Sequence, residues 1–313
     1  MQRQPLDNPH LEEHLKRISD DGIDVFVAGD QSVRGALLHG TELVNAMRAN
    51  HQLGILETLI LGHSYMAVGL MSTDLKEHGR VSISIDCSGP VDGIQVEATA
   101  RGEIRGYLRN NAIPVDHELE SFDISPFVGT GIISVTRYLE SRKQPFTGQV
   151  LMEHGTIAKD MANYYLQSEQ TPSAFNLSVQ FDSGGTVVGA GGLFAQGLPE
   201  ANKTNLGRME DRIRALPSLG QAFADGRTGA EILRTHFHDL KPDIIGTRKA
   251  EFFCHCSKER FARFMAALPE HELEDMKVNG PFPLRTTCHN CGSTYEFDRD
   301  EVAELAERMS TRH

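Results

Sequence analysis

Short stretches of alternating apolar and polar residues dominate the first 200 positions and predict a set of β-strands. Between Arg80 and Cys87, valine, two isoleucines and a cysteine alternate with serine and aspartate. This alternation is typical of a half-buried strand. Comparable patterns predict strands at Asp24–Gly29, Arg34–Leu38, Gly93–Ala100, Gly102–Arg109, Ala174–Asp182 and Thr186–Phe194, the last two as a hairpin around Ser183, Gly184 and Gly185.

Three other segments have the periodicity of helices. Thr41–His51 begins with a residue able to cap a helix, and its apolar residues recur at helical spacing. Ile55–Lys76 is mostly apolar and predicts a buried helix, and Thr156–Gln167 carries an isoleucine, a methionine and two tyrosines on one side. Many short strands with a few helices predict an α+β fold for a large N-terminal domain, residues 1–199.

The composition changes after Pro199. Residues 202–249 are rich in Arg, Asp, Glu and His, and Pro217 and Pro242 interrupt the helical pattern. We predict a helical linker over residues 200–249 whose thin apolar faces rest against the large domain; such a segment opens easily because little burial holds it. Its apolar residues form two stripes, Met209, Ile213 and Leu216, then Ile232, Leu233 and Phe237.

Length and charge narrow the possible functions. The chain has 313 residues, which suggests about two domains, and its formal net charge is −12. A negative charge argues against a nucleic-acid partner. No run approaches the ~20 consecutive apolar residues of a membrane span, and residues 1–21 lack the apolar region of a secretion signal. We therefore expect a cytoplasmic protein with neither a nucleic-acid nor a membrane partner.

The five cysteines carry the strongest chemical signal. Cys87 stands alone at the end of a predicted strand and reads as a small core residue. The other four form two close pairs, Cys254 with Cys256 and Cys288 with Cys291, in a C-terminal module, residues 250–313. Four thiolates complete a tetrahedral Zn²⁺ site, so we predict one zinc per chain. His255 and His289 are alternative ligands, but we expect each to point outward because each neighbours a ligating cysteine.

Two interpretations of this module remain open. Zinc is either a permanent structural staple or part of a redox switch, in which oxidation of the thiolates removes the ligands and releases the metal.

Two enzymatic motifs fail for lack of a parallel βαβ unit: the glycines of residues 189–192 as a dinucleotide loop, and Cys288 with Cys291 as a thioredoxin-like pair. No nucleophile–base arrangement stands out, and we expect no enzymatic activity.

Four segments together resemble a known family. They are Arg105–Asn110 (RGYLRN), Tyr164–Ala174 (YYLQSEQTPSA), Ala190–Pro199 (AGGLFAQGLP) and the four-cysteine module. Their order and spacing over roughly residues 20–300 are similar to the heat-shock protein 33 family of redox-regulated holdase chaperones.

The resemblance implies an ATP-independent chaperone that is folded and inactive while reduced and zinc-bound. It implies that oxidative stress forms the disulfides Cys254–Cys256 and Cys288–Cys291, expels zinc and unfolds module and linker. The exposed surface would then bind unfolding client proteins, with formation of a homodimer. Two alternatives stay open from the residues alone: a zinc-ribbon adaptor that binds a partner, and a thiol oxidoreductase that turns over a dithiol substrate.

Overall fold

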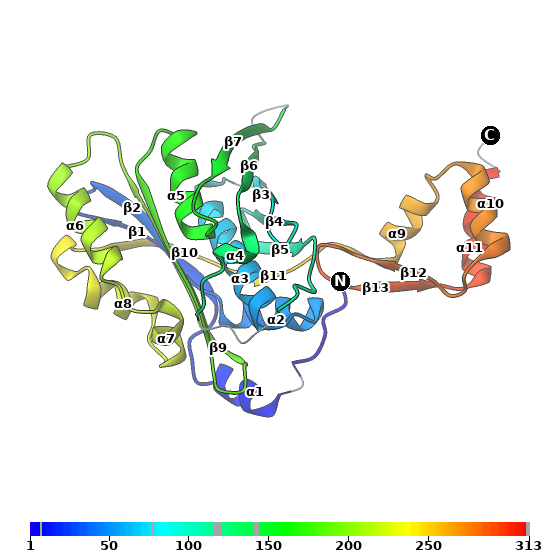
Figure 1. The fold of residues 1–313 in the computed structure, drawn as a ribbon, viewed down its shortest axis with the longest axis horizontal. Helices are drawn as coiled ribbons and strands as arrows, with labels where there is room; N and C mark the ends of the chain where they lie inside the picture. The colour runs from blue at the N-terminus through cyan, green and yellow to red at the C-terminus, as the bar shows by residue number, and fades with distance from the viewer. Residues whose placement is uncertain (7, 77, 116–120, 141–143, 311–313) are drawn as a thin grey trace.

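The protein folds into a broad body of two β-sheets with a small module that projects from one end (Figure 1). The computed structural model describes residues 1–6, 8–76, 78–115, 121–140 and 144–310. A five-stranded antiparallel sheet has the order β10-β1-β2-β9-β8, and a six-stranded sheet has the order β11-β5-β4-β3-β6-β7. Sheets and helices thus occur in one body, as the α+β prediction requires. The strands of the first sheet are β1 (Gly22–Ala28), β2 (Val33–His39), β8 (Ser173–Phe181), β9 (Val187–Gly197) and β10 (Asp243–Arg248); those of the second are β3 (Arg80–Cys87), β4 (Gly93–Thr99), β5 (Glu103–Leu108), β6 (Gly131–Tyr138), β7 (Phe146–Met152) and β11 (Glu251–Phe252).

Helix α3 (Ile55–Met71) lies between the two sheets and forms the centre of the core. It contacts β3, β4 and β5 on one side and β2, β8 and β9 on the other. Together with the short 3₁₀ helix η1 (Ser72–Asp74) it is long and apolar enough to cross a membrane, but 89% of its most apolar window is buried inside the fold. Tyr65, fully buried, donates its hydroxyl to the carbonyl of Gly106 at 2.9 Å. The apolar run is therefore explained by a core helix.

Helix α2 occupies the predicted range, Thr41–His51, but the expected cap is wrong. The side chain of Thr41 makes no capping bond; its hydroxyl accepts from the amide of Ala190 at 3.1 Å. The first turn is held instead by Asp21, whose carboxylate accepts from the amides of Leu43 (2.7 Å) and Glu42 (3.2 Å). Burial raises the pKa of Asp21 to about 7. Asp21, twenty positions upstream, thus accepts the first-turn hydrogen bonds that Thr41 was expected to accept.

Several elements lack a sequence prediction. Strand β7 presents Gly148, Val150 and Met152 to the core, while Leu151 is 64% exposed, so its apolar pattern does not alternate. The other unpredicted elements of the large body are α1 (Pro9–Leu15), β6 and the single turn α4 (Ser125–Val128). Helix α5 (Ile157–Gln167) agrees with its prediction.

The segment after Pro199 covers one face of the five-stranded sheet (Figure 1). Helices α6 (Lys203–Arg214), α7 (Leu219–Ala224) and α8 (Gly229–His236) and the turn η2 (His238–Leu240) carry both predicted stripes. Met209, Ile213, Ile232, Leu233 and Phe237 form one buried cluster with residues of β1, β2 and β9, and Leu216 packs at its edge. Both stripes therefore pack against the large domain as predicted. Five of their six residues are buried, which is more burial than the prediction of thin apolar faces implied.

Close packing of α7 on β9 explains the glycine-rich run. A Cβ atom on Gly189 would lie 1.9 Å from the carbonyl oxygen of Gly220, and one on Gly191 would lie 2.4 Å from the ring of Phe223. Both glycines lie within an antiparallel strand. They let a helix approach the sheet, which is incompatible with a dinucleotide loop between a parallel strand and a helix.

The linker prediction is wrong at its end, where residues 243–248 form strand β10 and not a helix. β10 pairs with β1, and after two residues β11 pairs in parallel with β5 of the other sheet. The chain then enters the projecting module. Its elements are α9 (Lys258–Met265), α10 (Glu270–Asn279), β12 (Leu284–Thr287), β13 (Thr294–Phe297) and α11 (Arg299–Ser310).

Candidate metal centre

Two loops bring the four cysteines together at the base of the module. Cys254 and Cys256 directly follow β11, and Cys288 and Cys291 lie in the turn between β12 and β13. This turn is closed by backbone bonds from Cys288 to Ser293 (2.9 Å) and from Gly292 to Cys288 (2.8 Å). Gly292 has φ +68°, in the left-handed region that glycine adopts without strain.

The four sulfur atoms form a compact, buried cluster. All lie within 4.8 Å of one another; Cys254 Sγ is 3.8 Å from Cys288 Sγ, and Cys256 Sγ is 3.3 Å from Cys291 Sγ. Ligands at a Zn–S distance of about 2.3 Å in a tetrahedron lie about 3.8 Å apart. The donor set and spacing thus fit a tetrahedral ion that prefers sulfur, and the cluster could bind such a metal.

A charged network from the six-stranded sheet reaches one of the sulfurs. The Arg105 guanidinium donates to Cys254 Sγ at 3.1 Å and pairs with Glu97 at 2.5 Å. Hydrogen bonds from the thiols of Cys288 and Cys291, and then from Arg105, hold the pKa of Cys254 well below its ordinary value. The resulting thiolate raises the pKa of Cys288 well above its ordinary value. Without a cation, a thiolate at Cys254 thus opposes a second thiolate at Cys288, whereas a bound divalent ion would offset the repulsion between thiolates.

Further polar groups surround the sulfurs, and sequence reasoning did not identify them. The Tyr295 hydroxyl lies 3.3 Å from Cys256 Sγ and donates to the Cys256 carbonyl at 3.1 Å. The Ser293 hydroxyl lies 3.2 Å from Cys291 Sγ. Arg105 belongs to the RGYLRN segment, and Ser293 and Tyr295 belong to the four-cysteine module, but nothing in the sequence indicates that these side chains contact the sulfurs.

The two histidines and the fifth cysteine lie outside the sulfur cluster. His255 turns toward the large domain, with its Nε2 3.0 Å from Glu103, and the His289 ring packs edge-on against Tyr107 at 5.5 Å. Cys87 lies at the end of β3, half-buried against the core, where burial raises the pKa of its thiol.

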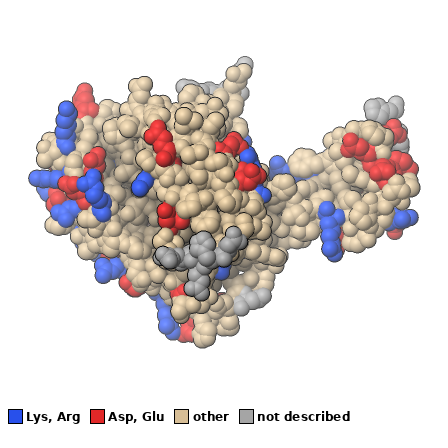
Figure 2. All heavy atoms as spheres, viewed as in Figure 1, with Lys and Arg blue, Asp and Glu red and all other residues tan. Residues whose placement is uncertain are grey.

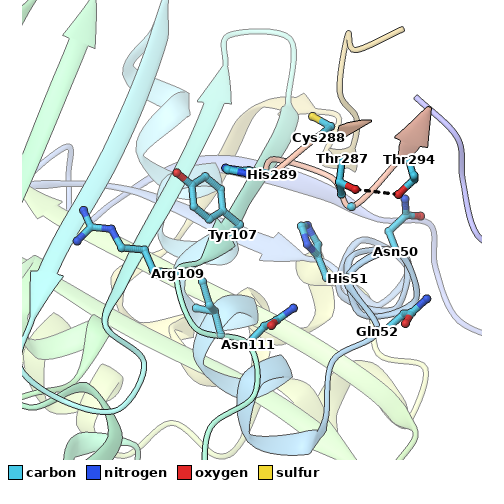
Figure 3. A pocket seen from close by; sticks show the side chains of 12 residues that line it. Asn50, His51, Gln52, Tyr107, Arg109, Asn111, Thr287, Cys288, His289 and Thr294 are labelled. Carbon is cyan, nitrogen blue, oxygen red and sulfur yellow. Dashed lines mark hydrogen bonds between the residues drawn. The ribbon is translucent and has the colours of Figure 1, made fainter. Parts of the chain in front are cut away.

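Two cavities lie beside the buried cluster. One of about 600 Å³ lies between module and large domain (Figure 3). His51, neutral because burial lowers its pKa to about 4, lines it together with Tyr107, Arg109 and His289. A second of about 390 Å³ is lined by Arg105 and by three of the cysteines, Cys254, Cys256 and Cys288. Cys288, which is only 7% exposed, borders both cavities.

Comparisons with known proteins agree with this architecture. The family model described as Hsp33 protein matches residues 21–298. The 33 kDa chaperonin of Lactiplantibacillus plantarum is 32% identical over 286 residues, 90% of this chain and 96% of the relative. That of Desulforamulus reducens is 32% identical over 287 residues, 91% and 97% of the two chains. The crystal structure of the 33 kDa chaperonin (heat shock protein 33 homolog) of Thermotoga maritima superposes with a TM-score of 0.83 at 28% identity, covering 94% of this chain and all of that one. The chain therefore belongs to the Hsp33 family.

Proposed function

We propose that this protein is an ATP-independent holdase chaperone that oxidation switches on. The observation that carries the proposal is the position of the sulfur cluster, which joins two loops of the module where the chain leaves β11. Zinc, held by Cys254, Cys256, Cys288 and Cys291, would keep the sulfurs deprotonated and cross-link the loops. Metal binding of this kind contributes roughly 10–16 kcal/mol to the folding of a small module.

Oxidation proceeds on the thiolates themselves, with a peroxide as oxidant. One thiolate attacks a peroxide oxygen and the O–O bond breaks; with one proton taken up, the products are a sulfenic acid and water. A second thiolate attacks the sulfenic sulfur, the S–O bond breaks, and the departing hydroxide leaves as water after taking a proton. Each disulfide removes two ligands from the metal.

We assign the disulfides to Cys254–Cys256 and Cys288–Cys291. In the folded cluster two sulfur–sulfur contacts cross between the loops, Cys254–Cys288 at 3.8 Å and Cys256–Cys291 at 3.3 Å. Once the module loosens, the entropy of loop closure favours partners close in sequence. Peptide mapping of the oxidised protein tests this: disulfides that join the loops would refute the assignment.

Loss of the module's fold would then free the linker. We divide the chain into a core of residues 1–199, a linker of 200–249 and a switch of 250–313. The linker helices cover apolar residues of the five-stranded sheet, among them Phe26, Leu37 and Leu193, all at most 1% exposed. Uncovering this face and the apolar linker helices would provide surface for unfolding clients. We place the protein in a reducing cytoplasm, where thiols stay reduced, and expect the activated chain to form a homodimer.

The surface charge fits this function better than nucleic-acid binding. Figure 2 shows acidic side chains gathered at the outer end of the module, where α10 and α11 lie, and mixed charges over the linker helices. An acidic surface repels a phosphate backbone.

The test measures metal and activity in one sample. Reduced protein should contain one zinc per chain with a four-sulfur coordination spectrum, and peroxide should release it as the protein begins to suppress aggregation of a heat-unfolded client. Cys288→Ser should lose regulated release, while Cys87→Ser serves as the matched control. Zinc release without suppression would favour an adaptor, and catalytic turnover of a dithiol substrate would favour an oxidoreductase.

A further inference from the structure

The first four residues of the chain lie across both cysteine loops. The amide of Cys254 donates to Met1 Sδ at 3.1 Å. The amide of Gln2 donates to the Ser293 hydroxyl at 3.0 Å, and this hydroxyl donates back to the Gln2 carbonyl at 3.0 Å. These residues precede residue 21, where the match to the family begins. One short segment thus touches the loop of the first cysteine pair and that of the second.

Asn50, in the last turn of α2, joins this segment to the second loop. Its side chain is buried, with Oδ1 accepting from the Gln4 amide at 3.0 Å. Its Nδ2 donates to the carbonyls of Gln2 and Cys291, both at 2.9 Å. The second loop also presses on the helix, since a Cβ atom on Gly292 would lie 2.3 Å from the Asn50 carbonyl oxygen. One amide therefore connects the large domain, the N-terminal segment and a candidate ligand loop.

The N-terminal segment is fixed to the large domain at its far end as well. Asn8 caps α1 and donates to the Thr186 hydroxyl at 3.4 Å. His14 Nε2 lies 2.7 Å from the Val188 carbonyl, and Leu11 is buried. Because residues 8–14 are already fixed to the large domain, holding residues 1–4 on the loops costs less conformational entropy than holding a free chain end would.

We propose that Asn50 and residues 1–4 form a clasp that holds the cysteine loops on the large domain and sets how readily they open. Asn50 is a positioning residue, because it touches the Cys291 carbonyl and no sulfur. One consequence of the clasp rests on the proposed function: more oxidant is needed to release zinc while the clasp is intact. The clasp itself predicts slower opening of the loops without any oxidant.

Two matched pairs of variants test the clasp in the full-length, reduced, zinc-loaded protein. Asn50→Ala removes all three side-chain bonds, and Asn45→Ala is its control. Asn45 lies in the same helix, is equally buried, and donates to the carbonyls of Thr41 and Val187 within the large domain. Gln4→Pro removes the backbone amide that donates to Asn50 and also fixes φ at that position. Gln4→Ala keeps this backbone amide and removes only an exposed side chain.

The first readout is hydrogen exchange of amides in residues 254–257 and 287–294. We expect at least tenfold faster exchange in Asn50→Ala and about fivefold in Gln4→Pro, as for the loss of one net hydrogen bond. The second readout is the rate of zinc release at fixed peroxide, which should rise in the same order. Both controls should match the parent in these loops.

Unchanged exchange in both Asn50→Ala and Gln4→Pro, or equal acceleration in Asn45→Ala, would overturn the clasp. Faster exchange with no effect of peroxide on zinc or activity would keep the clasp and reject the redox switch. Faster exchange with an unaltered rate of zinc release would reject the proposed role in setting the threshold.

Discussion

Phe237 ends helix α8 and is fully buried in the cluster between the linker and the five-stranded sheet. We predict that Phe237→Asp opens the linker of the reduced, metal-loaded protein and activates it without oxidant. Thr235→Asp is the matched control, because Thr235 lies two residues earlier on the exposed side of the same helix. Both variants add one carboxylate, but only Phe237→Asp places it at a buried position and removes a buried ring.

The magnitude follows from the burial of the ring. Truncation of a buried phenylalanine costs about 3–5 kcal/mol, and a carboxylate at this position adds a penalty for removing charge from water. Because the ring contacts the sheet only while the linker is docked, the cost falls on the docked state. Opening should become at least roughly 10²–10⁴-fold more frequent.

Hydrogen exchange over α6–α8 measures the opening, and light scattering of a heat-unfolded client measures the holdase activity. Zinc analysis must show that the metal stays bound. Linker exchange equal to that of Thr235→Asp would refute the docking argument. An open linker that leaves the client to aggregate would show that the switch acts elsewhere.

Three further predictions concern single side chains. Cys87→Ser should leave peroxide-dependent zinc release intact, with a modest loss of thermal stability, because Cys87 is half-buried at the end of β3 and far in sequence from the module; loss of activation would reject this. Arg105→Met should raise the pH at which acid releases zinc, because without the guanidinium protons compete for Cys254 at higher pH. Loss of a hydrogen bond to a metal ligand typically costs about 10–100-fold in metal affinity, and an unchanged release curve would show that Arg105 does not tune the site. Burial raises the pKa of Asp21 from 3.8 to about 7, so the folded state binds a proton at this carboxyl more tightly than the unfolded state does. The free energy of unfolding should therefore fall as pH rises from about 4 to 7. Asp21→Asn should remove this part of the decline in thermal stability with pH, and an unchanged pH profile would contradict the reasoning.

The sequence predicts helices and strands best where one face of the element is buried and the other is exposed to solvent. Strand β3 and helix α2 have the predicted bounds because their apolar residues follow the period of the element. The clustering of the four cysteines is also predicted from the sequence, because two close cysteine pairs are typical of a tetrahedral metal site, and the four sulfurs do lie within 4.8 Å of one another. The cap of α2 fails because Asp21 acts from a different segment, and local patterns carry no information about which distant side chain reaches a helix end.

Contacts between segments far apart in sequence also decide how the cysteine loops connect to the linker. The sequence places β10 in a polar linker because residues 202–249 are rich in Arg, Asp, Glu and His. In the fold five of its six residues are exposed, yet it extends one sheet by pairing with β1. β11 contains only two residues and joins the other sheet, where Phe252 is buried near Tyr65. The chain between β10 and β11 lies directly on the turn before β5, since a Cβ atom on Gly102 would lie 1.9 Å from the Lys249 carbonyl oxygen. Cys254 follows two residues after β11. Because the first cysteine loop connects to β11, whose pairing is only two residues long, we expect movement of that loop to separate β11 from β5 before it affects β10 and the linker helices. No property of residues 243–252 alone indicates this pairing with a distant strand.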